Sequence, residues 1–185
     1  MHQKDKLYLS RKLINKGKEV MKNELQARVV KEVNNLFEEE KQFLHTLTSY
    51  PSTRGNEQSA QKFMASELSK RNYEVDVWNV NVNDISHLPG FSPVIGDYTD
   101  AINVVGSHKS KTKKGRSLIL NGHIDVVPEG PLEMWDTPPY EPRVDNGWMY
   151  GRGVGDMKAG LAANLFALDA IRATGFAPAA DVFFQ

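Results

Sequence analysis

From Asn23 to about residue 50, apolar residues recur every three or four positions, the spacing of an amphipathic helix. These positions are Leu25, Val29, Val33, Leu36, Phe37, Leu44 and Leu47. The helix is expected to end before Pro51, because a residue that precedes a proline is biased out of the helical region. After the turn PSTRGNE, Asn56 is a candidate N-cap for a second helix. Its inward residues are expected to be Ala60, Phe63, Met64 and Leu68.

Three segments in the middle of the chain have the pattern of strands. Tyr73, Val75 and Val77 alternate with polar residues, which predicts a half-buried strand. Residues 101–107 and 117–122 are two more candidates, and the second is apolar enough to be a central strand. The basic run KSKTKKGR between them is expected to be the solvated tip of a hairpin.

The last third of the chain continues the alternation of helix and strand. The segment RVDNGWMYGRG predicts a hairpin that turns on Asn146-Gly147. A helix is expected from about Met157 to Thr174, capped by Gly175, and DVFFQ is expected to be a buried strand. Strands that alternate with helices predict an α/β fold.

The first 22 residues differ in charge from the rest. They hold seven Lys or Arg residues against Asp5 and Glu19, a net charge of about +5 in a chain whose formal net charge is zero. We therefore divide the chain into a basic extension, 1–22, and a globular part, 23–185. The extension is open to three interpretations: a solvated tail, an arm for an anionic partner, or a stretch that precedes a natural start at Met21. We favour the last of these over an arm for a partner.

Composition excludes several classes of protein. The balance of 23 basic and 23 acidic residues argues against a nucleic-acid-binding or membrane-coating protein. The absence of cysteine excludes disulfide frameworks, Cys-ligated zinc and Cys nucleophiles. No apolar run is long enough to span a bilayer, and no signal peptide opens the sequence. We expect a cytoplasmic location.

The first candidate for chemistry is LILNGHIDVVPEG. An apolar strand leads to His123 and Asp125 at its carboxyl end, where open α/β sheets place their ligand sites. A histidine can bind a metal through one ring nitrogen while the other donates to a carboxylate, and Asp125 suits that second role. The alternative is a His–Asp hydrogen bond that only holds a loop.

The second candidate is GRGVGDMKAG, in which three glycines precede Asp156 at the start of a helix. A carboxylate in that place is stabilised by the helix dipole, so Asp156 is either a functional group or simply an N-cap. The glycine spacing fits neither a dinucleotide fingerprint nor a phosphate loop. For a joint site, the intervening linker must fold back and bring Asp156 to His123.

Together, NGHIDVVPEG, WDTPPYEP and YGRGVGDMKAG resemble the acetylornithine deacetylase/succinyl-diaminopimelate desuccinylase family of two-zinc metallohydrolases. Aminoacylases and glutamate carboxypeptidases are relatives of this family. The resemblance extends from about Asn23 to the end, and PSTRGNE with its following helix also fits. It implies a three-layer α/β/α catalytic domain, of which this chain is expected to be the N-terminal part.

The resemblance also implies roles for three residues. His123 matches a zinc ligand, Asp125 the catalytic-site carboxylate that orients this histidine, and Asp156 the aspartate that bridges two metals and precedes a cis peptide bond. The cofactor is expected to be zinc, two ions per complete enzyme, with cobalt or manganese as alternatives. The reaction implied is amide hydrolysis of a small N-acyl amino acid, as in acetylornithine deacetylase.

Other parts of the implied machinery have no counterpart in the sequence. The family's adjacent glutamates, further metal ligands and a smaller dimerisation domain would all follow the DVFFQ strand. We therefore expect the 185-residue chain to be inactive alone and the complete enzyme to be a homodimer. Two alternatives remain: an exopeptidase of the same family, which acts on a small peptide, and a non-catalytic fragment that binds a partner or one metal ion.

Overall fold

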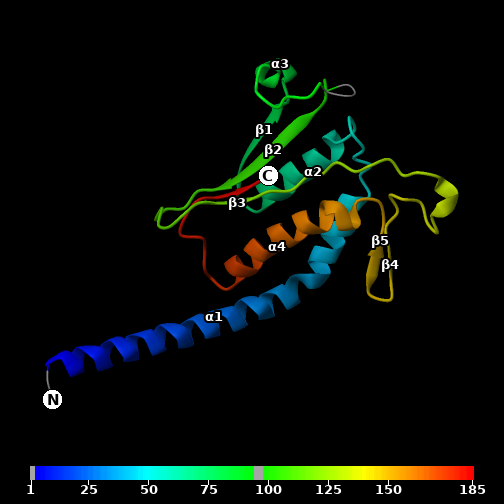
Figure 1. Cartoon of the computed structure of the whole chain (residues 1–185). Coiled ribbons are helices and arrows are strands. Elements are labelled where there is room, and N and C mark those ends of the chain that lie inside the picture. Colours follow the sequence, from blue (N-terminus) through cyan, green and yellow to red (C-terminus); the bar gives the residue numbers. More distant parts are fainter. Residues whose placement is uncertain (1–2, 94–97) are drawn as a thin grey trace.

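The computed structural model describes residues 3–93 and 98–185 (Figure 1). Side chains are described from residue 20 onward. The chain forms four α-helices and six strands in this part. The helices are α1 (Gln3–Thr48), α2 (Gln58–Lys70), α3 (Val82–Ile85) and α4 (Ala159–Ala173). The strands are β1 (Glu74–Asn79), β2 (Ile102–His108), β3 (Leu118–Leu120), β4 (Arg143–Asp145), β5 (Trp148–Tyr150) and β6 (Val182–Phe184). A 3-10 turn, Leu132–Met134, and a π-type turn, Val154–Lys158, complete the elements.

Helix α1 begins at Gln3, well before the start predicted at Asn23. Apolar periodicity reports only where a helix meets a core, and residues 3–22 contain no proline and many good helix formers. The expected basic extension therefore shares one continuous helix with the globular part, and this helix projects beyond the other elements (Figure 1). Despite its length, no helix in the described residues has an apolar stretch suited to crossing a membrane.

A four-stranded mixed sheet in the order β1-β2-β6-β3 forms the centre of the fold. Strand β2 is antiparallel to both β1 and β6, and β3 is parallel to β6. The prediction that β3 is central was wrong: it lies at an edge of this sheet, with Ile119 57% exposed. The basic run 109–116 is not a hairpin tip either, because β6 lies between β2 and β3. An apolar run indicates a strand but does not reveal its partners.

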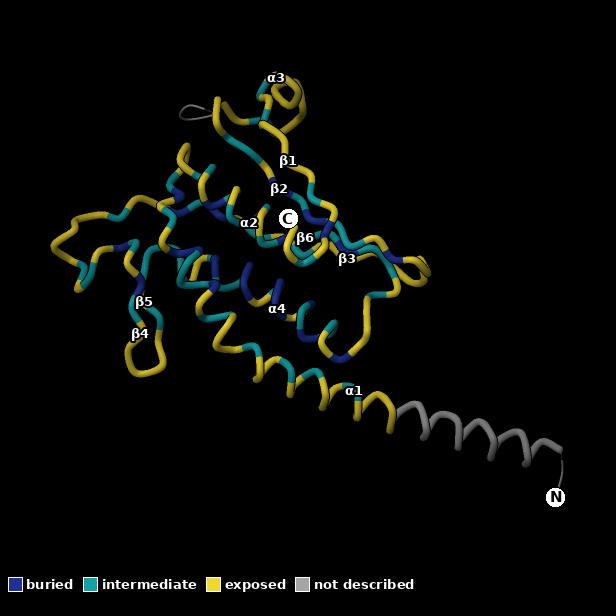
Figure 2. The backbone as a smooth tube through the Cα atoms, turned by 180° about the vertical axis from the view of Figure 1, so that it is seen from behind, coloured by how far each residue is buried: buried dark blue, intermediate teal, exposed yellow. Residues whose placement is uncertain are grey.

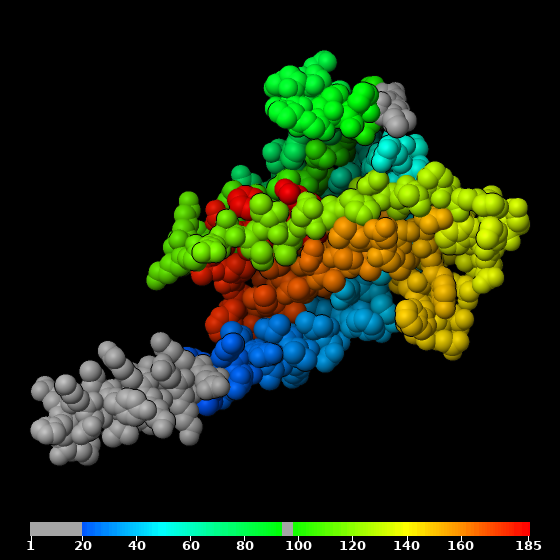
Figure 3. Space-filling view, in the orientation of Figure 1, coloured from blue at the N-terminus to red at the C-terminus, as the bar shows by residue number. Residues whose placement is uncertain are grey.

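Helices α2 and α4 pack against this sheet and bury the core. Side chains along the strands alternate, so that Val104 and Phe184 are buried while Val105 and Phe183 are partly exposed. Figure 2 shows buried stretches, in dark blue, along α4 and β2. Helix α1 lies along α4 on the side away from the sheet (Figure 3). The α/β class is confirmed. The core consists of Phe43, Leu47, Ala60, Met64, Leu68, Tyr73, Val104, Ile124, Leu161, Ala162, Leu165, Phe166, Leu168, Val182 and Phe184.

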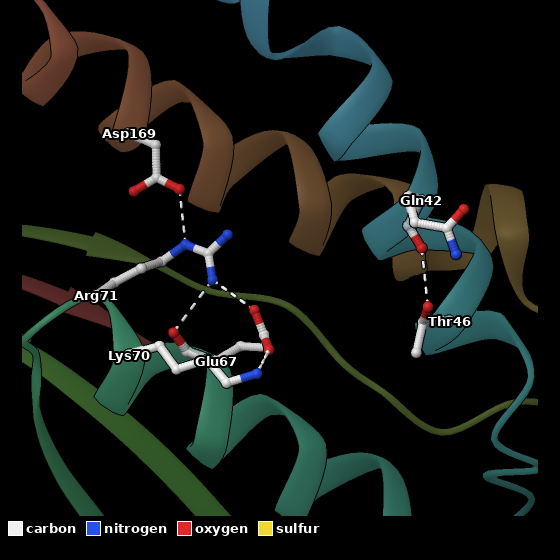
Figure 4. A network of polar contacts seen from close by, with 6 residues as sticks. All are labelled: Gln42, Thr46, Glu67, Lys70, Arg71 and Asp169. Atoms are coloured by element: carbon white, nitrogen blue, oxygen red, sulfur yellow. Dashed lines mark hydrogen bonds and ion pairs between the residues drawn. The ribbon is translucent and has the colours of Figure 1, made fainter.

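A network of ion pairs joins α2 to α4 beside this core (Figure 4). The guanidinium of Arg71, just after α2, donates to Glu67 in α2 and to Asp169 in α4, each at 2.6 Å. The Arg71 and Glu67 side chains are each 13% exposed, so this network is shielded from water more than a surface pair is. It fixes the relative position of the two helices.

Two local predictions have different outcomes. The hairpin β4–β5 forms as expected, with Asn146 and Gly147 both at positive φ. Asn56, in contrast, is not the N-cap of α2. Glu57 occupies that position without a side-chain cap, while the Asn56 side chain donates to Thr53 Oγ1 at 3.1 Å. An asparagine side chain can form hydrogen bonds within a turn as well as at a helix N-terminus, and the Asn56 side chain forms its bond within the turn.

Candidate functional site

The first part of the site is an extended segment that follows β3. Its residues alternate: Ile124 and Val126 are buried, whereas His123 and Asp125 have side chains 48% and 42% exposed. Because successive side chains of an extended chain point to opposite sides, the histidine and the aspartate share the outer side. The spacing of two residues therefore brings both polar side chains to the same side of the segment.

The second part is the glycine-rich turn that leads into α4. Gly153 has φ +82°, and Asp156 has an extended backbone (φ −129°, ψ 96°) inside the turn Val154–Lys158. The peptide bond between Asp156 and Met157 is cis, as the family resemblance implied. The Asp156 side chain is 91% exposed and makes no cap hydrogen bond to α4, so the alternative role of a simple N-cap is wrong.

The linker does fold back and brings these parts together. The distance from His123 Nε2 to Asp156 Oδ1 is 3.0 Å. The other ring nitrogen, Nδ1, is 3.2 Å from Asp125 Oδ1 and 3.1 Å from the backbone carbonyl of Asp125. All three candidate residues thus meet around one imidazole, with one carboxylate on each side of the ring.

The surroundings of His123 favour its protonated form in the metal-free protein. Desolvation by itself lowers its pKa. The hydrogen bonds to the Asp125 carbonyl and the Asp156 carboxylate, together with the charges of both aspartates, outweigh desolvation and raise the pKa above its usual value. The same electron-rich environment suits a metal cation in place of the proton.

These donors fit one side of a zinc site. Zinc binds imidazole nitrogen and carboxylate oxygen at about 2.0–2.2 Å, so one ion can reach two donors about 3 Å apart. Asp125 supplies the outer hydrogen bond that orients a ligating histidine and increases its basicity. Within the described residues, however, no group of three or more potential ligand side chains gathers. The described residues therefore offer two donors at this place, His123 Nε2 and Asp156 Oδ1, and an orienting carboxylate.

A pocket of about 260 Å³ opens between the two parts of the site. Residues on both sides of it include His123 and Asp125 from one segment and Arg152 and Asp156 from the other. Two contacts fix the Arg152 side chain: its guanidinium donates to the Glu129 carbonyl at 2.9 Å and lies over the Trp135 ring, 5.0 Å from the ring centroid. The His123 side chain therefore borders this pocket.

Sequence reasoning missed two buried polar residues next to the site, Lys158 and Ser52. Both are 0% exposed. Burial lowers the pKa of Lys158 to about 8. The only signal in the sequence was a lysine two residues after Asp156, at the start of an otherwise apolar helix, and such a lysine is normally interpreted as a solvated charge.

Comparison with known proteins confirms the resemblance. Residues 119–185, which contain all three candidate residues, match the family described as Peptidase family M20/M25/M40. A curated relative from Halalkalibacterium halodurans, N-formyl-4-amino-5-aminomethyl-2-methylpyrimidine deformylase, is 38% identical over 146 residues. A succinyl-diaminopimelate desuccinylase from Methylobacillus flagellatus is 52% identical over 56 residues, which are 30% of this chain and 15% of that protein.

Solved structures agree on the fold. The dipeptidase Dug1p from Saccharomyces cerevisiae aligns over 85% of this chain and 33% of its own, with a TM-score of 0.67 and 21% identity. The alignment with the deformylase covers 77% of this chain and 30% of the deformylase. The chain thus spans about a third of the length of these proteins.

Proposed function

We propose that this chain, which matches the M20/M25/M40 peptidase family over residues 119–185, forms part of the catalytic domain of a metal-dependent hydrolase that cleaves an amide bond. In this proposal His123 and Asp156 are ligands of a zinc ion, and Asp125 is the carboxylate that orients His123. The geometry around the imidazole carries the proposal, because it places one nitrogen against each carboxylate.

The roles of the three side chains follow from their contacts. A carboxylate at Nδ1 keeps the proton on that nitrogen, so that a metal ion can replace the proton on Nε2, the nitrogen on the side of Asp156. Asp156 is almost fully exposed at the pocket, which leaves its second oxygen available to another ion or to solvent. Zinc, when bound, supplies polarisation of the substrate carbonyl and a lowered pKa of a bound water.

For the substrate we propose a small N-acyl compound. The names of the two relatives above, a deformylase and a desuccinylase, describe removal of a small acyl group, and one of them aligns with most of this chain. Among such substrates an N-acyl amino acid, as in acetylornithine deacetylase, remains our proposal. Likeness to the dipeptidase supports the fold alone, so hydrolysis of a dipeptide is an outcome of the substrate test rather than a second proposal.

Zinc binding by the purified 185-residue chain tests the assignment. Calorimetric titration is expected to show weak binding that both His123→Ala and Asp156→Asn abolish. His87→Ala is the matched control, since His87 is an exposed histidine away from the pocket, and it is expected to bind zinc like the unmodified chain. Binding that survives both site substitutions would contradict the proposed ligands.

A substrate panel tests the reaction class in any longer protein that includes this sequence. The panel contains N-acetylornithine, N-succinyl-diaminopimelate, an N-formylated amine and a dipeptide. Turnover of an acyl compound that requires zinc and His123 supports a deacylase. Turnover of the dipeptide alone would replace that assignment with an exopeptidase.

A further inference from the structure

The segment from Leu47 to Thr53, which we term the anchor segment, lies beneath both parts of the candidate site. It comprises the end of α1 and the turn that follows. Leu47, Thr48 and Ser52 within it are each 0% exposed. Packed interiors of this kind transmit displacement instead of absorbing it. A residue that is bound to the anchor segment is therefore held rigidly.

The segment that carries His123 and Asp125 is attached to the anchor segment by Ser52. The Ser52 hydroxyl donates to the backbone carbonyl of Ile124 at 2.6 Å. In return, the backbone N–H of Val126 donates to the Ser52 carbonyl at 2.9 Å. Ile124 is the residue between His123 and Asp125, so these bonds fix the backbone from which both side chains project.

The turn that carries Asp156 is attached to the same anchor segment by Lys158. Its ammonium donates to the carbonyls of Leu47 at 3.1 Å and Tyr50 at 2.8 Å. The Leu47 carbonyl belongs to the last turn of α1, where carbonyls lack helical partners and a cation is stabilised by the helix dipole. Among the ion pairs of the described residues, none involves Lys158.

The hydrogen bonds of Ser52 and Lys158 do more than stabilise the fold, because they attach the segments of His123 and Asp156 to one place. A buried ammonium without a carboxylate costs free energy unless other polar groups compensate it, and here two backbone carbonyls of the anchor segment do so. Lys158 lies two residues after Asp156, and the acceptor of Ser52 lies directly beside His123. The two attachments therefore meet at one rigid segment and determine how far apart the proposed ligands stand.

We propose that Ser52 and Lys158 are positioning residues, which set the separation of His123 and Asp156 by tying both ligand-bearing segments to the anchor segment. This inference rests on the proposed function, since it concerns the geometry of the proposed metal site. Neither residue touches the imidazole or the Asp156 carboxylate; each acts through the backbone.

The test compares Ser52→Ala and Lys158→Met with Thr174→Val. Thr174 is a matched control, because its hydroxyl also donates to a backbone carbonyl, that of Ile171, at 2.6 Å and the residue is 7% exposed. Each chain is measured in three ways: thermal unfolding, the NMR cross-relaxation between the His123 ring and the Asp156 β-protons without metal, and the zinc dissociation constant.

Ser52→Ala and Thr174→Val are expected to lower the melting temperature by similar amounts. The His123–Asp156 cross-peak is expected to weaken only in Ser52→Ala and Lys158→Met, with zinc affinity about 10-fold lower, as is typical when the support of a metal ligand is removed. If Lys158→Met does not fold, the cross-peak and the zinc affinity of Ser52→Ala alone test the positioning role.

Either of two results would overturn the inference that Ser52 and Lys158 position the site. A folded Ser52→Ala chain with the cross-peak and zinc affinity of the unmodified chain means that Ser52 does not position the site. Loss of the cross-peak in Thr174→Val as well means that any loss of stability loosens it. If instead the unmodified chain shows the cross-peak but binds no zinc, the proposed function fails, and the metal-free cross-peaks still decide the positioning role.

Discussion

Gly153 lies so close to Val126 that a Cβ on the glycine would stand 2.3 Å from Val126 Cγ1. The glycine belongs to the turn of Asp156, and Val126 belongs to the segment of His123. This approach, together with the positive φ of Gly153, lets the two halves of the candidate site touch directly. A side chain at position 153 would therefore push these two halves apart.

Gly153→Ala is expected to destabilise the fold and to separate the halves of the site. A positive φ costs a non-glycine residue about 1–2 kcal/mol, and the clash with Val126 adds roughly 1–3 kcal/mol. Gly175→Ala is the matched control, because Gly175 has nearly the same φ, +83°, and open space where a Cβ would go. Chemical denaturation of both variants measures the difference, and equal losses would contradict the close approach.

The Glu67–Arg71–Asp169 network predicts a dependence of stability on pH. Desolvation raises the pKa of Glu67, but hydrogen bonds from Lys70 and Arg71 and their charges outweigh it and lower the pKa below the usual 4.5. The stabilisation is therefore complete above about pH 4.5 and is lost as the pH falls through the lowered pKa of the folded state.

Glu67→Gln is expected to reduce stability at neutral pH by about 1.5–3 kcal/mol, the typical contribution of a hydrogen bond to a charged group. The difference from the unmodified chain should shrink as the pH falls below 4.5. Glu38→Gln serves as a control, since the Glu38 side chain is 80% exposed and its ion pair with Lys41 lies at the surface. Urea denaturation at several pH values provides the measurement, and a difference that does not vary with pH would argue against the network.

Removal of residues 1–21 is expected to leave the globular part intact. Val20 and Met21, the first residues of α1 whose side chains are described, are 49% and 64% exposed, and partial burial begins at Leu25. The melting temperature should stay within about 2 °C of the full chain. A decrease of several degrees, which corresponds to about 1 kcal/mol or more, would show that the extension packs on the fold.

Asp125→Asn is expected to weaken zinc binding without a change of shape. An outer carboxylate on a ligating histidine typically contributes about 10–100-fold to metal affinity. Asp145→Asn is a suitable control, because Asp145 is a half-exposed residue of the β4–β5 hairpin whose partner is Arg143. Calorimetric titration of the two variants should show the loss in the first only; equal affinities would remove Asp125 from the site.

The 185-residue chain alone is expected to hydrolyse N-acetylornithine at no significant rate, even with zinc. Its two proposed ligands are fewer than the three or four donors that a zinc site needs. No glutamate of the described residues lines the pocket between His123 and Asp156. Absence of a general base costs about 10²–10⁴ in rate. Robust turnover that His123→Ala abolishes would show that the chain carries a complete active site.

The sequence was sufficient wherever the determinant is local. Asn146-Gly147 predicts its hairpin because two adjacent residues must both accept positive φ. The helix that follows Asp156 and its termination by Gly175, which has φ +83° directly after the C-cap Thr174, were predicted from spacing and from one glycine. The pairing of His123 with Asp125 also follows from a separation of two residues in an extended chain. Each of these depends on neighbours along the chain.

Only the tertiary structure decided the features that depend on distant partners. Strand β3 lies at an edge because β6, more than sixty residues later, inserts between it and β2. Lys158 resembles a solvated lysine in the sequence, yet it is buried because the carbonyls of Leu47 and Tyr50, over a hundred residues earlier, accept its hydrogen bonds. The 3.0 Å contact of His123 with Asp156 likewise joins two segments that lie 33 positions apart, both of which are hydrogen-bonded to the segment Leu47–Thr53.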